Sequence, residues 1–231
     1  MPTTLQATGI GDHRLWGVLR RYLVSDEIEA LGFAVAYVSV YGASQLDSLL
    51  RATGGRAIRM VVDIGDAITH PRALELGLEA NWRIRVVNPS AGTFHPKIIV
   101  GGRAFADTDL LSAPRLLIVG SANLTRGGLS NNVECSLLRT SEQDINGISA
   151  IFRRLWRQGT DLDQPALREY EAYFAEQNRK RAPRDMEILG VADEAASELA
   201  TTYNLRTIGG PDFRRERDVS GYGSSRWLRR P

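Results

Sequence analysis

Lysine is nearly absent from this sequence: of its 29 basic residues only Lys97 and Lys180 are lysine, and the others are arginine. Arginine carries a wide planar fork, whereas lysine carries a compact charge on a flexible stem. A lysine at position 97 of an arginine-rich chain therefore indicates a site that needs the smaller cation, with chance as the alternative explanation.

Cysteine and long apolar runs are also scarce. The single cysteine, Cys135, excludes an internal disulfide framework and a cysteine-rich zinc site, and its position predicts a small core residue. No apolar run is long enough to cross a bilayer, and no signal peptide is visible, so we expect a cytoplasmic protein with no membrane partner. The net charge of +2 does not by itself indicate nucleic-acid binding.

The pattern of apolar residues predicts an α/β fold, a mixed β-sheet flanked by helices. Strands are expected over residues 33–40, 58–64, 84–87, 95–100, 115–119 and 133–138. Helices are expected after a cap at Asp12, over 44–50 and 71–80, after residue 145, over 165–179 and, more weakly, over 193–203. Early strands alternate with helices and later strands follow one another, which is typical of a sheet of mixed direction.

The chain is expected to divide into residues 1–158, a catalytic domain, and residues 159–231, a small helical extension with a mobile Arg-rich tail. The tail could contact a phosphate backbone, remain solvated, or link the domain to another segment.

Polar side chains gather at the ends of three predicted strands. Alternation along a strand sends His95 and Lys97 to one face. Ser121 and Asn123 follow the next strand, and Glu134 begins the one after. If these strands are neighbours, the five side chains meet at one edge of the sheet.

This set of side chains suits phosphoryl chemistry. An imidazole can act as a nucleophile or as an acid and base near neutral pH. A lysine and an asparagine can bind phosphate oxygens, and a glutamate can orient an imidazole. Three glycines, Gly120, Gly127 and Gly128, would let the backbone approach an anion, and Arg126 beside them would either contact nucleic acid or face solvent.

The ordered pattern H-x-K, then G-S-x-N, then a glutamate resembles the phospholipase D superfamily, and most of all its bacterial, metal-independent nuclease branch. The likeness is strong over residues 93–138 and weaker before them. It implies that His95 attacks phosphorus to form a phosphohistidine, that Lys97 and Asn123 bind the phosphoryl oxygens, that Ser121 supports them, and that Glu134 orients His95. It also implies catalysis without a metal or other cofactor.

The resemblance has one departure and one structural consequence. The aspartate that completes the family motif would fall at Gly102, and Asp107 and Asp109 are out of register. This departure favours the nuclease branch over the lipid-cleaving enzymes. Family members combine two motifs in one active site, whereas this chain has one, so the resemblance implies a homodimer in which His95 of each copy shares the site.

Plainer interpretations remain beside this one. His95 could be a core histidine, Ser121 and Asn123 could be turn residues, and Glu134 could be a charge at a strand edge. We expect an endonuclease that cleaves DNA, or RNA as the other nucleic acid. Restriction or phage defence, with a recognition or motor subunit, is the setting we expect for it. The alternatives are a phospholipid head-group hydrolase and a non-catalytic nucleic-acid-binding or assembly module.

Overall fold

A computed structural model describes residues 4–8, 14–24, 27–89, 92–140 and 142–181. The strands are β1 Thr4–Thr8, β2 Ala30–Val35, β3 Ala57–Asp63, β4 Arg83–Val87, β5 Lys97–Gly102, β6 Ala104–Phe105, β7 Leu111–Ser112, β8 Leu116–Gly120, β9 Glu134–Arg139 and β10 Thr160–Asp161. The helices are α1 Leu15–Leu23, α2 Val40–Ala52, α3 Pro71–Glu79, the short π-helix η2 Gly127–Asn131, α4 Glu142–Gln158 and α5 Gln164–Lys180.

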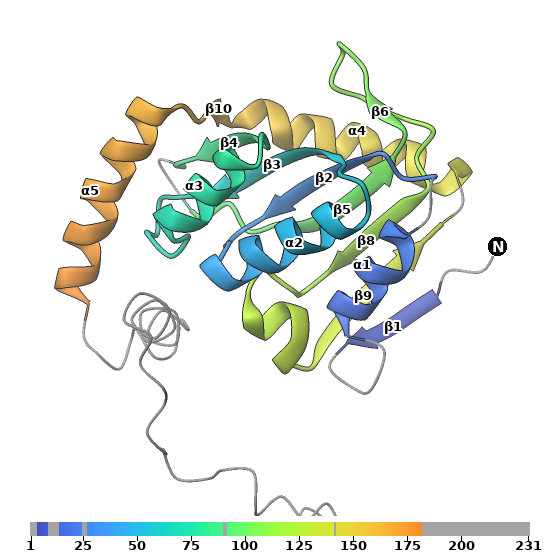
Figure 1. Ribbon diagram of the computed structural model, residues 1–231, viewed down its shortest axis with the longest axis horizontal. Coiled ribbons are helices and arrows are strands. Elements are labelled where there is room, and N and C mark those ends of the chain that lie inside the picture. The colour runs from blue at the N-terminus through green and yellow to red at the C-terminus, as the bar shows by residue number, and fades with distance from the viewer. Residues whose placement is uncertain (1–3, 9–13, 25–26, 90–91, 141, 182–231) are drawn as a thin grey trace, which may run out of the picture. The chain divides into compact units, whose positions relative to one another are not determined.

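Eight strands form one mixed sheet in the order β1-β9-β8-β5-β2-β3-β4-β10 (Figure 1). Strands β2, β3 and β4 are parallel, and every other neighbouring pair is antiparallel. The expected mixed α/β sheet flanked by helices is therefore confirmed. The short strands β6 and β7 form a separate hairpin between β5 and β8.

Each face of the sheet is covered by helices. Side chains of α1, α2, α3 and α5 pack with alternate residues of β2 such as Leu31 and Phe33 in one buried cluster. The opposite residues of β2, Ala30 and Ala34, pack with Phe152 and Trp156 of α4 in a second cluster. Because the side chains on both faces of the central strands are buried, these strands appear in the sequence as continuous apolar runs.

Several elements differ from their predicted limits. The strand expected over 33–40 ends at Val35, because the chain turns there toward α2, which begins at Val40. Ser39 caps that helix by accepting a hydrogen bond from the Gly42 N–H at 3.0 Å, so the helix starts before the predicted residue 44. Arg14, not Asp12, precedes α1, and Asp12 lies outside the described residues.

The C-terminal part of the chain is partly integrated with the sheet. Strand β10 lies in the segment predicted as a helical extension and pairs with β4, and β1 was not predicted. Helix α5 follows a cap in which Asp163 accepts a hydrogen bond from the Ala166 N–H at 2.8 Å. The predicted helix over 193–203 and the Arg-rich tail lie outside the described residues, and the domain division at 158 stays a prediction.

Candidate active site

The sheet brings the predicted polar residues to one edge. Antiparallel pairing of β5 with β8 matches Ile98 with Val119, which leaves Lys97 at the start of β5 beside the end of β8. Pairing of β8 with β9 matches Gly120 with Ser136, so Glu134 starts β9 at the same edge. The carboxyl ends of β2 and β3 reach this edge as well, since β2 pairs with β5 and β3.

His95 and Lys97 lie against one another. The ammonium nitrogen Nζ of Lys97 is 2.9 Å from Nδ1 and 3.0 Å from Nε2 of His95. A protonated lysine can donate only to a ring nitrogen that carries no proton of its own. The imidazole is exposed on its other sides, except that the edge of the Tyr37 ring approaches it, with 5.8 Å between ring centroids. Thus the histidine is accessible and is not the core residue of the plainer interpretation.

The environment of Lys97 alters its ionisation. Partial burial lowers the pKa of the Lys97 ammonium below that of an ordinary lysine, and the nearby negative charge of Glu134 opposes this change. A carboxylate can act on the amine in this way only when the two are close, so Glu134 and Lys97 belong to one electrostatic group.

Ser121 joins the ends of β8 and β9. Its hydroxyl donates a hydrogen bond to Oε2 of Glu134 and accepts one from the Cys135 N–H at 3.1 Å. The second oxygen of Glu134, Oε1, accepts from the Asn132 side chain at 3.2 Å. No hydrogen bond joins Glu134 to His95 within the part of the chain that the structure describes, so the predicted orienting role of Glu134 stays a prediction.

Asn123 is held from the neighbouring strand end. Its Oδ1 accepts a hydrogen bond from the Tyr37 N–H at 3.3 Å, while the Tyr37 ring approaches His95. Tyr37 therefore contacts both Asn123 and His95, which were predicted on separate strands. With Oδ1 engaged, the Asn123 amide NH₂ is the group with which this side chain could donate to a phosphate oxygen.

The three predicted glycines serve close packing in this structure. A Cβ on Gly128 would overlap the backbone of Asn123, and one on Gly120 would overlap Ser136. A Cβ on Gly127 would lie 2.9 Å from the Asn132 side chain. The glycines thus let the segment after β8 fold tightly around Asn123, which gives them a structural reason independent of any anion.

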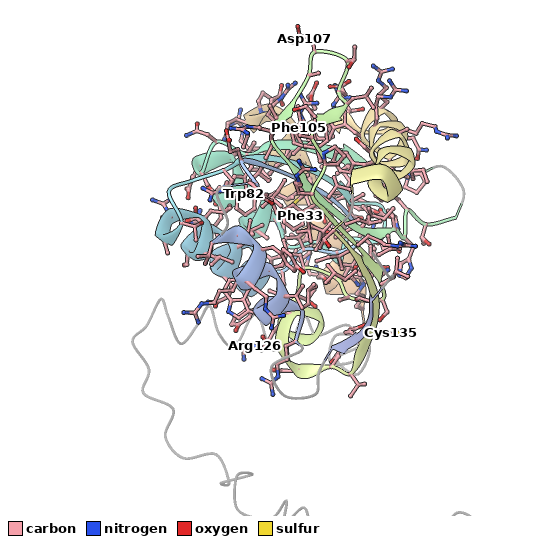
Figure 2. The ribbon with its side chains drawn as sticks, turned by 90° about the vertical axis from the view of Figure 1, so that its right-hand side faces the viewer. Phe33, Trp82, Phe105, Asp107, Arg126 and Cys135 are labelled. Atoms are coloured by element: carbon pink, nitrogen blue, oxygen red, sulfur yellow. The ribbon has the colours of Figure 1, made fainter. Side chains whose placement is uncertain are left out.

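Arg126 lies on the surface beside this segment. Its guanidinium carbon is 4.7 Å from the centroid of the Tyr41 ring, which comes from the first turn of α2. Figure 2 shows Arg126 and Cys135 at the same end of the molecule, with Asp107 of the β6–β7 connection at the other. Arg126 is therefore exposed three residues after Asn123, with its guanidinium over the ring of Tyr41.

The structure corrects the expectation for Cys135 and explains the absence of the family aspartate at Gly102. Cys135 is exposed, not a core residue, because alternation along β9 places it on the face opposite the buried Ser136 and Leu138. Gly102, where the family aspartate would fall, has no room for a side chain, since a Cβ would lie 2.6 Å from the Ser112 carbonyl oxygen. The packing of the β6–β7 hairpin against Gly102 therefore leaves no space for the aspartate of the family motif at this position.

Sequence reasoning missed two residues near His95, Tyr37 and Asp63. Asp63 ends β3, is 2% exposed, and accepts a hydrogen bond from the Phe94 N–H at 2.7 Å. The sequence did carry a signal for Asp63, because a carboxylate at the end of a largely apolar strand is unusual. Tyr37 gave no comparable signal, since its sequence neighbours predicted a strand continuing through it.

Other chemistry is limited within the described residues. No three His, Cys, Asp or Glu side chains among them gather closely enough to hold a metal ion. No helix within the described ranges has the length and apolar character needed to span a membrane.

Comparison with solved structures identifies similar folds. Nuc from Salmonella typhimurium, a phospholipase D family member, aligns with a TM-score of 0.50 at 14% identity over 71% of this chain and 99% of Nuc. NucT from Helicobacter pylori aligns with a TM-score of 0.45 at 13% identity over 70% of this chain and 99% of NucT. Phosphatidylserine synthase from Haemophilus influenzae Rd KW20 aligns at 0.47 and 14% identity, over 77% of this chain and 46% of that chain.

Comparison of sequences identifies the family. No curated protein matches this chain. The family described as "Cardiolipin synthase, PLD-like domain" matches residues 33–156, which include every strand and loop that supplies the site. Because that match spans more than half of the sequence, the chain belongs to the family of phospholipase D-like domains.

Proposed function

We propose that this protein is a phosphodiesterase that cleaves DNA through a phosphohistidine, without a metal ion. The observation that carries the proposal is the accessible His95 imidazole in contact with the Lys97 ammonium, at the sheet edge shared with Ser121, Asn123 and Glu134. This arrangement joins a nucleophile, a cation and hydrogen-bond donors, which is what displacement at phosphorus requires.

The reaction has two displacements. One ring nitrogen of His95 attacks phosphorus, and the bond from phosphorus to the leaving oxygen breaks as that oxygen takes a proton from an acid. Water then attacks the phosphohistidine and gives a proton to the conjugate base of that acid, while the phosphorus–nitrogen bond breaks and His95 is regenerated. Lys97 and the Asn123 amide bind the two non-bridging oxygens, on which negative charge concentrates. Glu134, held by Ser121, supports the cationic groups around the phosphate.

The acid in the first step is proposed to be His95 of a second copy. The motif of one chain supplies the single imidazole of His95, and an isologous dimer would bring two of these imidazoles to one axis. The surface beside the site suits such a contact, since Val133 is 75% exposed and Cys135 is exposed on the same strand end. Exposed apolar side chains next to a half-complete site favour burial against a partner.

DNA is proposed as the substrate because Arg126 and Tyr41 extend the site along the surface. A guanidinium over an aromatic ring offers a phosphate contact and a stacking face, both of which suit a nucleic-acid strand. RNA is the alternative strand that the same groups could contact. A recognition or motor subunit would supply sequence specificity, as in restriction or phage defence.

A phospholipid diester is the competing substrate. The matching family carries the name cardiolipin synthase, and one similar structure is a phosphatidylserine synthase. The chemistry at phosphorus would be the same, so the two proposals differ only in the groups that flank the phosphate. A non-catalytic binding module is the third possibility, and it predicts that no phosphohistidine forms.

The deciding experiment compares wild type with His95→Ala on supercoiled plasmid, single-stranded DNA, RNA and phosphatidylcholine vesicles, all in excess EDTA. We expect wild type to cleave DNA and the variant to be inactive at equal concentration and equal thermal stability. Arg126→Ala serves as a matched variant at the same surface, expected to raise KM for DNA with a smaller change in kcat.

Each alternative has its own outcome. Cleavage that survives His95→Ala would show that the imidazole is not the nucleophile. Release of choline from vesicles with intact DNA would favour the lipid substrate. Sedimentation analysis should find a dimer at micromolar concentration, and a strict monomer with full activity would contradict the shared site.

A further inference from the structure

The carboxylate of Asp63 is buried directly behind the segment that carries His95. It ends β3 and is only 2% exposed. Its Oδ1 accepts a hydrogen bond from the Gly65 N–H and its Oδ2 accepts one from the Phe94 N–H, both at 2.7 Å. No ion pair with a basic side chain is seen for it among the described residues. A buried carboxylate held only by backbone donors is therefore an unusual choice for this position.

Burial makes this carboxylate unfavourable unless its hydrogen bonds offset the loss of water. Burial raises the pKa of Asp63, while the Gly65 and Phe94 N–H groups act in the opposite direction, as does the nearby His95. A neutral residue at position 63 would avoid this penalty. The presence of a carboxylate is therefore explained by the groups that it binds. One of its two donors belongs to the residue directly before the proposed nucleophile.

The hydrogen bond to Phe94 is one of several restraints on His95. The Phe94 side chain is buried in the core cluster that also contains Trp156 of α4. On the other side, Pro96 restricts the backbone of His95 to extended conformations, and Lys97 begins β5 in register with Val35. The main chain is thus fixed on both sides of His95, by Phe94 on the N-terminal side and by the pairing of Lys97 in the sheet on the C-terminal side.

The position of Asp63 is itself strengthened by its neighbours. The buried hydroxyl of Thr69 donates to the Asp63 carbonyl oxygen at 2.8 Å. Tyr170 and Tyr173 of α5 donate to the carbonyl oxygens of Thr69 and Gly65, at 2.5 and 2.7 Å. The turn after β3 is therefore tied to a helix that lies outside residues 33–156 matched by the family.

We propose that Asp63 is a positioning residue for His95, acting through the N–H of Phe94 to hold the imidazole where it can attack phosphorus. The proposal rests on the function proposed above, because it takes His95 as the nucleophile. Asp63 does not touch the substrate, so its effect should appear in the rate of the chemical step and not in substrate binding.

The test uses Asp63→Asn in the full-length protein. Asparagine has nearly the same size but offers one acceptor oxygen where aspartate has two, so one of the two N–H groups loses its partner. The matched control is Thr69→Val, which removes two buried hydrogen bonds, one from the Thr69 hydroxyl to the Asp63 carbonyl oxygen and one from the Val38 N–H to that hydroxyl, without touching Phe94. Should Asp63→Asn not fold, the smaller Asp63→Ser, which also retains one acceptor, replaces it.

Two measurements are made on each variant. With bis(p-nitrophenyl) phosphate as a small diester, Asp63→Asn should lower kcat by about 10²-fold and leave KM within about twofold, as a displaced nucleophile would. Thr69→Val should change kcat by less than about threefold. In hydrogen exchange, the Phe94 amide should exchange about tenfold faster in Asp63→Asn than in Thr69→Val.

The outcomes separate the two proposals. If wild type and His95→Ala hydrolyse the diester equally, the proposed nucleophile is wrong, and Asp63 has no catalytic group to position. If His95 is required but Asp63→Asn retains the kcat of Thr69→Val, or raises KM alone, Asp63 is not a positioning residue. A loss of kcat in Asp63→Asn with unchanged Phe94 exchange would show that the effect does not pass through the Phe94 N–H, and would overturn the inference.

Discussion

The ammonium nitrogen of Lys97 lies 2.9 Å from one ring nitrogen of His95 and 3.0 Å from the other. A phosphate diester bound beside this pair would be attracted by the positive charge of the Lys97 ammonium. The same contact would place its phosphorus next to the imidazole. The pair is therefore arranged to bring an anionic substrate to the proposed nucleophile.

The lowered pKa of Lys97 predicts a loss of activity at alkaline pH. Burial favours the neutral amine, so phosphate binding should weaken as pH rises through a range below that of an ordinary lysine. The measurement is kcat/KM against pH, which reports groups of the free enzyme. Lys97→Arg should remove this alkaline limb while lowering kcat by about 10-fold or more, because its planar fork does not replace a compact ammonium. An alkaline limb that persists in Lys97→Arg would assign it to another group.

The hydrogen bond between Ser121 and Glu134 predicts graded losses. Glu134→Gln removes the negative charge beside Lys97 and should lower kcat by about 10²-fold. Ser121→Ala keeps that charge but frees the carboxylate, so its loss should be smaller, about tenfold. Steady-state kinetics on one DNA substrate would compare them. The double variant should lose less than the product of both effects, and full multiplicative losses would show that the residues act separately.

The packing of Gly128 predicts that a single methyl group disturbs Asn123. A Cβ at Gly128 would overlap the Asn123 backbone, so Gly128→Ala should destabilise the fold by about 2 kcal/mol and reduce activity through Asn123. Gly147 in α4 is the control, because a Cβ there meets nothing within 4 Å. Gly147→Ala should stabilise the protein by about 1 kcal/mol, since alanine favours helix. Urea denaturation measures both, and equal effects of the two substitutions would contradict the packing argument.

Asp109 predicts a stability effect remote from the site. Its carboxylate oxygen Oδ1 lies 2.6 Å from a guanidinium nitrogen of the nearly buried Arg59. The guanidinium carbon of Arg59 also lies 4.4 Å from the Phe105 ring centroid. Asp109→Asn keeps a residue that tolerates the observed φ of 66° but leaves Arg59 without its anion, so a loss of about 2–3 kcal/mol is expected. Asp107→Asn, on the exposed tip of the same hairpin, should change stability by less than about 0.5 kcal/mol (Figure 2). A similar denaturation midpoint for both variants would contradict the role of this ion pair.

Local patterns were enough to predict most elements that build the sheet. Apolar runs such as residues 58–64 and the proline before α3 indicate their elements directly, since strand periodicity and helix starts are local properties. The early end of β2 was not predictable, because it follows from Ser39 bonding to the Leu124 carbonyl, a contact between distant segments. Likewise β10 is too short to carry a periodic signal and exists through its pairing with β4.

Residue types and their order already define the chemistry available to this protein: the imidazole of His95, the rare lysine Lys97 and a spacing of polar groups typical of phospholipase D-like proteins. These follow from residue types and their order, which need no coordinates. How the groups are held follows from the folded chain, in which Asp63 binds the Phe94 N–H, Tyr37 contacts both His95 and Asn123, and Ser121 binds Glu134. The reason is physical, because burial and long-range hydrogen bonds depend on which strand ends meet, and sequence spacing does not record that.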